Sequence, residues 1–283
     1  MKCIITPKRM EGYRTYLYQE EKSGSTIEKY LSDLKKLVTY AAGREITKEL
    51  MICYKNFLKN EKNYKISSIN SYLVAANGFF EYMGWYGLKV KTFRVQKKVF
   101  VPEEKVLTQK EFAKLVQAAR STGKMRLAMV LQTICATGMR VSELQFVTVE
   151  SLRKGVVTIY NKGKERTILI PKSLQYRLLA YIHENAIRTG IIFCTSGGRP
   201  LDRTYIWREM KKLCLLTGVE ADKVFPHNLR ALFARTYYVL FKDIAKLADL
   251  LGHSNIETTR IYIKSSGVEH RRQLDSMGLL ENL

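Results

Sequence analysis

With 283 residues, the chain is long enough to form two domains of ordinary size. Hydrophobic residues make up 46% of it and charged residues 26%, a balance that excludes a disordered protein. The formal net charge is +22, and the excess is positive on both sides of residue 105. A basic excess spread over two folded parts favours nucleic acid as the partner, with a generally basic protein such as a ribosome-associated factor as the alternative.

The first hundred residues predict a small bundle of four helices on short connections. The clearest helix begins at Ser25, where apolar side chains follow at spacings of three and four up to Gly43. The expected ranges are about 8–21, 25–43, 47–58 and 67–84.

A basic stretch, FRVQKKVFVPEEK at 93–105, lacks a helical period and predicts an extended linker. A second part begins at Thr108, whose spacing to Glu111 fits a capping box. Helices dominate from there, except that 156–160 and 166–171 flank a turn and predict a β-hairpin. The expected fold is therefore mainly α, with a mixed but mainly helical second domain that holds a small hairpin.

Five scattered cysteines include no CxxC pair, which favours a reducing cytoplasm without disulfides or structural zinc. They are Cys3, Cys53, Cys135, Cys194 and Cys214. No segment approaches 18 apolar residues, so we expect no membrane insertion. Neither acidic clusters with metal-ligand spacing nor a GxxxxGK[ST] loop occurs, and we expect no cofactor.

Chemistry-bearing residues are concentrated in four short stretches of the second part. In TGMRVSEL at 137–144, Gly138 suits a helix C-cap, and Ser142 with Gln145 suits the N-cap of a next helix. Arg140 would then lie at a fixed corner, although a solvated arginine beside a turn is the alternative. The hairpin turn carries two lysines, Lys162 and Lys164, which could reach into a bound minor groove or donate a proton. The alternative is that they only keep the turn soluble.

The third stretch, PHNLR at 226–230, opens a helix with Pro226 in its first turn. Spacing of three places His227 and Arg230 on one face, where an imidazole could titrate beside an arginine that binds a phosphate. A polar helix start with a capping histidine is the alternative.

The fourth stretch is a predicted helix at 243–252 that ends at Gly252 and is followed by His253. Ser254 and Glu257 suggest a capping box for a further helix carrying Tyr262. A packed tyrosine and a helix-turn-helix DNA reader are the alternatives.

Together, these residues offer what phosphodiester cleavage by a side-chain nucleophile needs: fixed positive donors, a proton acceptor and a group that protonates the leaving oxygen. In order and separation, the four stretches resemble the tyrosine recombinase (phage integrase) family, in particular its short Xer-like members. The matching residues are TGMRVSEL, YNKGKERTILIP at 160–171, PHNLR and LLGHSNIETTRIY at 250–262.

The resemblance implies a role for each matching residue. Tyr262 is expected to form a 3′-phosphotyrosine, and Arg140 and Arg230 to bind the non-bridging phosphate oxygens. His227 is expected to accept the tyrosine proton and His253 to contact the phosphate. Lys162 is expected to be the general acid for the leaving hydroxyl. The turn is one residue shorter than the common family form, so Lys164 stays the alternative. Glu143 would support the arginine and histidine, and DNA-binding roles fall to Lys97, Lys98 and Lys164.

The resemblance also implies an architecture. A SAM-like core-binding domain at 1–92, a linker at 93–105 that crosses the DNA and a catalytic domain at 106–283 would close as a C-shaped clamp on double-stranded DNA. A homotetramer, alone or with a partner recombinase or accessory protein, would exchange strands through a Holliday junction, with 266–283 docking on its own or a neighbouring domain. The expected tasks are mobile-element integration or excision, or Xer-like resolution. The alternatives are type IB topoisomerase-like relaxation and a regulator that binds DNA without cutting it.

Overall fold

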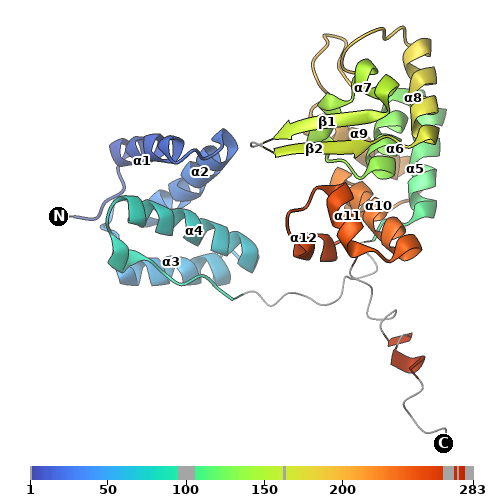
Figure 1. Cartoon of the computed structure of the whole chain (residues 1–283). Coiled ribbons are helices and arrows are strands. Elements are labelled where there is room, and N and C mark those ends of the chain that lie inside the picture. Colours follow the sequence, from blue (N-terminus) through green and yellow to red (C-terminus); the bar gives the residue numbers. More distant parts are fainter. Residues whose placement is uncertain (1, 95–105, 162–163, 264–270, 273, 278–283) are drawn as a thin grey trace, which may run out of the picture. The chain divides into compact units, whose positions relative to one another are not determined.

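The computed structural model describes residues 2–94, 106–161, 164–263, 271–272 and 274–277 (Figure 1). Lys97, Lys98, Lys162 and most of 266–283 lie outside them. The chain divides into two compact units, Met1–Lys97 and Lys98–Leu283. The predicted mainly helical fold with a small hairpin is confirmed. Among the described residues, no helix is long and apolar enough to span a membrane.

The first unit is the predicted four-helix bundle, followed by a 3₁₀ turn. Its elements are α1 (Pro7–Gln19), α2 (Gly24–Ala41), α3 (Lys48–Asn60), α4 (Ile66–Tyr82) and η1 (Tyr86–Leu88). The side chains of Thr6 and Thr47 cap α1 and α3 by accepting backbone N–H bonds in the first turn. The apolar stripe of α2 is buried, as its spacing predicts.

The chain leaves this bundle along α4 through residues 89–94, here called the exit segment. The Asn77 amide donates to the Val90 carbonyl at 2.8 Å and accepts the Val90 N–H at 3.0 Å. Asn70, two turns earlier, makes the same pair of bonds to Phe93, both at 2.8 Å. Two asparagines on one face of α4 therefore bind the exit segment much as a neighbouring strand would.

The second unit is built around α6, which packs against α5, α8, α9 and α10. Its elements are α5 (Gln109–Ser121), α6 (Met125–Thr137), η3 (Val141–Phe146), α7 (Val149–Lys154), β1 (Val156–Asn161), β2 (Lys164–Leu169), α8 (Lys172–Glu184), α9 (Arg203–Thr217), η4 (Ala221–Lys223), α10 (Pro226–Phe241), α11 (Ile244–Leu251) and α12 (Ile256–Arg260). The predicted capping box of Thr108 and Glu111 is confirmed at the start of α5.

The hairpin of β1 and β2 is antiparallel, with Val157 opposite Ile168 and Ile159 opposite Arg166. β2 begins two residues before the predicted range. In Figure 1, α10, α11 and α12 form one group, orange to red, next to this hairpin. The residues with predicted chemistry lie where this group, the hairpin and the end of α6 meet.

Candidate active site

Arg140 lies at a sharp corner between α6 and η3. Gly138 ends α6 with a left-handed φ of 65°, and a Cβ there would lie 2.5 Å from the Phe233 ring. The predicted cap by Ser142 and Gln145 is wrong, because Arg140 itself is the N-cap of η3. Glu143 accepts the Arg140 backbone N–H at 2.7 Å and an Arg140 Nη1 bond at 2.9 Å. The carboxylate thus fixes the backbone and the side chain of the same arginine.

Glu143 also binds Arg166, which reaches it from β2. The Arg166 Nη1 donates to both carboxylate oxygens at 2.8 and 2.9 Å, and its Nη2 donates to the Leu250 carbonyl at 2.9 Å. A Cβ on Gly252 would lie 2.5 Å from the Arg166 side chain, so this glycine makes room for it. Arg166 therefore joins the Arg140 corner, the hairpin and the end of α11.

Arg166 was not predicted from the sequence, although β2 contained a signal for it. Side chains along β2 alternate between exposed and buried, and Arg166 shares the inner face with the buried Ile168. An arginine on the apolar face of a strand indicates a buried partner. Burial lowers the pKa of Arg166, while the Glu143 carboxylate opposes that shift.

Arg230 is the most deeply buried member of the predicted set. Its side chain enters the interior from α10, and the residue is 1% exposed. Its Nη1 donates to the Gly138 carbonyl and its Nη2 to the Leu251 carbonyl at 2.6 Å. Burial, followed by the charges of Arg140 and Arg166, lowers the pKa of Arg230 to about 10, while the nearby Tyr262 raises it. The guanidinium remains charged near neutral pH.

Tyr262 lies in a turn directly after α12, not on the predicted helix. The predicted Ser254 cap is also wrong, because Asn255 is the N-cap and its side chain accepts the Glu257 N–H at 2.8 Å. The tyrosine is 8% exposed and packs with apolar residues of α10 and α11. Its hydroxyl lies 3.1 Å from His227 Nε2.

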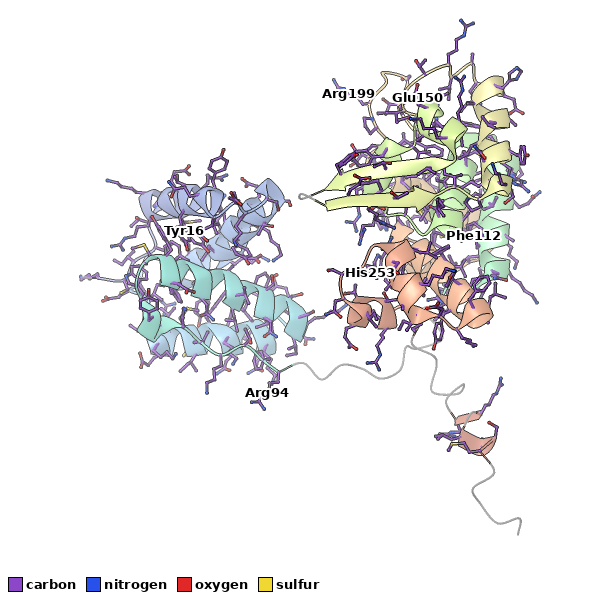
Figure 2. All side chains as sticks on the ribbon, in the orientation of Figure 1. Tyr16, Arg94, Phe112, Glu150, Arg199 and His253 are labelled. Carbon is purple, nitrogen blue, oxygen red and sulfur yellow. The ribbon has the colours of Figure 1, made fainter. Side chains whose placement is uncertain are left out.

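His253 follows Gly252 at the end of α11, where Figure 2 labels it. Its Nε2 lies 2.9 Å from Arg230 Nη2, and its Nδ1 lies 2.9 Å from Thr259 Oγ1. The imidazole stacks on the Tyr262 ring, with centroids 5.7 Å apart and planes 7° from parallel. Sequence reasoning missed Thr259, whose spacing from His253 carried no recognisable signal.

The structure thus gathers six residues of the predicted set into one basic site. These are Arg140, Glu143, His227, Arg230, His253 and Tyr262. Burial, then the charges of Arg230, Arg203 and Arg140, lowers the pKa of His227. Its imidazole is therefore neutral near neutral pH and able to accept a proton. Lys164 begins β2.

Comparison with known proteins identifies both units. Residues 105–268 match the model of the phage integrase family, and residues 10–87 match the N-terminal SAM-like domain of phage integrases. Tyrosine recombinase XerA of Pyrococcus furiosus is 30% identical over 97% of this chain and 95% of its own. Tyrosine recombinase XerD of Vibrio cholerae is 27% identical over 88% of each chain.

Solved structures share the fold at lower identity. XerH recombinase bound to a palindromic difH substrate matches with a TM-score of 0.73 and 19% identity, covering 88% of this chain and 79% of that one. A lambda integrase tetramer bound to a Holliday junction gives a TM-score of 0.74 and 20% identity, covering 92% and 77%. The family resemblance carried by the four sequence stretches is confirmed: the chain belongs to the phage integrase family of tyrosine recombinases.

Proposed function

We propose that this chain is a site-specific DNA recombinase that cuts a strand with Tyr262 and rejoins it to another strand. The observation that carries the proposal is the Tyr262 hydroxyl, 3.1 Å from a neutral imidazole nitrogen of His227. The same helix, α10, supplies the buried positive charge of Arg230. A nucleophile, a base and a fixed cation are the elements of covalent phosphoryl transfer.

In the cleavage step, the Tyr262 oxygen attacks the scissile phosphorus and its proton passes to His227 Nε2. A bond forms between phosphorus and the phenolic oxygen, and the bond to the 5′ oxygen breaks. The leaving oxygen takes a proton from Lys162, which we prefer over Lys164. Arg140 and Arg230 stabilise the extra negative charge on the phosphate, since guanidinium groups bind its oxygens as paired donors.

Rejoining is the reverse reaction with a 5′ hydroxyl from a different strand. The phosphotyrosine conserves the energy of the broken phosphodiester, so the chemistry needs no nucleotide and no cofactor. Glu143 holds the Arg140 corner throughout, and His253 contacts the phosphate region beside Arg230. Each role is assigned to a residue that matches the family pattern.

Similarity to DNA-bound recombinases supports double-stranded DNA as the partner. XerH was solved on a difH site and lambda integrase as a tetramer on a Holliday junction. We propose a core-binding domain at 1–92 and a catalytic domain at 106–283 that bind the same half-site through the linker 93–105. Lys97, Lys98 and Lys164 would bind DNA, four copies would assemble, and 266–283 would dock between them. We assign the activity to the cytoplasm.

Incubation of the chain with nicked sites from the flanks of its own gene tests the proposal. The expected result is a covalent adduct and recombinant junctions with the wild type, and neither product with Tyr262→Phe. Supercoil relaxation without junctions would instead identify a topoisomerase. Specific binding without any adduct would identify a regulator that does not cut.

A further inference from the structure

Thr259 contacts two neighbouring residues of the site, His253 and Tyr262. It lies on the last turn of α12, fully buried at 0% exposure. Its hydroxyl oxygen is 2.9 Å from His253 Nδ1, and its carbonyl accepts the Tyr262 N–H at 3.0 Å. One threonine therefore holds the ring of the histidine and the backbone of the tyrosine.

The second ring nitrogen of His253 decides which nitrogen carries the proton. Its partner, 2.9 Å away, is Arg230 Nη2, and a guanidinium has donors only. His253 Nε2 must therefore accept. A neutral imidazole has one N–H, which then lies on Nδ1 and donates to the Thr259 hydroxyl oxygen. Burial, then the charges of Arg230, Arg140 and Arg166, lowers the pKa of His253 to about 4, so the ring is neutral near neutral pH.

Arg230 depends on this arrangement for its orientation. Its Nη2 is held between the Leu251 carbonyl at 2.6 Å and His253 Nε2, while its Nη1 binds the Gly138 carbonyl. With the opposite tautomer, an N–H of His253 would face an N–H of Arg230. The two donors would repel, and the guanidinium would lose its hydrogen bond to His253.

We propose that Thr259 is a positioning residue: its hydroxyl accepts the Nδ1–H bond of His253 and so holds the ring with Nε2 against Arg230, which helps to orient Arg230 in the DNA-free enzyme. The value of this for catalysis rests on the proposed function, while the tautomer itself does not. A hydroxyl is required at this position because a methyl group of the same size offers no acceptor. Serine keeps the acceptor and valine keeps the shape, so the two substitutions separate hydrogen bonding from packing.

Nitrogen-15 NMR of histidine-labelled chain measures the tautomer without DNA. The chain has four histidines, and the signals lost in His253→Gln identify the relevant ring. We expect a protonated Nδ1 and an unprotonated Nε2 in the wild type and in Thr259→Ser. In Thr259→Val we expect Nδ1 to stay protonated, because Arg230 still faces Nε2, but the proton on Nδ1 has lost its acceptor and should exchange with water faster than in the wild type. Thr258→Val is the matched control, because it makes the same change on an exposed neighbour and should leave the spectrum unchanged.

Single-turnover cleavage and DNA affinity complete the experiment. Thr259→Val should slow adduct formation about tenfold, the effect of one lost hydrogen bond, with DNA affinity within about twofold of wild type. Thr259→Ser should restore most of the rate. A wild-type ring protonated on Nε2 overturns the proposal without any variant, as does a Thr259→Val chain with the wild-type cleavage rate or wild-type exchange of the Nδ1 proton. Absence of cleavage by the wild type would sink the recombinase function but leave the tautomer result standing.

Discussion

Replacing Arg166 by methionine tests the hydrogen bonds through which this side chain joins three segments of the active site. The change removes two hydrogen bonds to Glu143, whose side chain is 7% exposed, and one to the Leu250 carbonyl. Loss of one partner from a buried ion pair lowers the free energy of unfolding by about 3–5 kcal/mol, because the remaining charge stays uncompensated in the protein interior. Glu143 keeps its two bonds from Arg140, so we expect the low end, about 3 kcal/mol. In a unit of this size that lowers Tm by about 6–12 °C.

Denaturant unfolding of the full chain measures this loss, with Lys212→Met as the control. Lys212 donates to Glu209 at 2.6 Å but is 62% exposed, and its loss should change the free energy of unfolding by less than about 0.5 kcal/mol. Adding Glu143→Gln to Arg166→Met removes the stranded carboxylate and should recover about 1–2 kcal/mol. A loss of less than about 1 kcal/mol for Arg166→Met would contradict this explanation, as would a double variant whose loss of unfolding free energy equals the sum of the two single losses.

Three further outcomes follow from the structure. Gly138→Ala should lower the free energy of unfolding by about 2–4 kcal/mol, because Gly138 has a positive φ and a Cβ there would clash with Phe233. Gly123 has a similar φ but open space around it, so Gly123→Ala should lower the same free energy by only about 1 kcal/mol in the same denaturant assay. The folded pKa of His253, about 4, lies below its unfolded value of 6.5, so the unfolded chain takes up a proton first as the pH falls. The free energy of unfolding should therefore fall as pH drops from about 6.5 towards 4, and His253→Gln should flatten that part of a stability–pH curve. Asn77→Leu leaves two backbone groups of the exit segment unpaired and should cost about 1–2 kcal/mol, with faster amide exchange at residues 89–94 but not in the middle of α4.

Local patterns in the sequence predicted most of the fold because the forces behind them are local. The apolar spacing along α2 and the capping box at Thr108 each involve residues within a turn or two, and each appears as expected. Gly138 and Gly252 were identified as helix ends on the same basis. Both glycines also make room for a side chain from a distant segment, Phe233 at Gly138 and Arg166 at Gly252, which no local pattern shows.

The parts that sequence reasoning missed depend on choices between similar residues or on distant partners. Ser254 and Asn255 are both good N-caps, and the structure uses the second, which leaves Tyr262 in a turn beyond α12. The bonds of Arg230 reach carbonyls 92 and 21 residues away and exist only after the second unit has folded. Family motifs identified Arg230 and Tyr262, but not the hydrogen bonds that orient them.

Mass spectrometry of the trapped DNA adduct identifies the side chain that attacks the phosphate. After digestion of the protein and the DNA, we expect a single modified peptide, with nucleotide joined through a 3′-phosphate to the oxygen of Tyr262. Nucleotide attached to any other side chain, or an unchanged adduct formed by Tyr262→Phe, would contradict it.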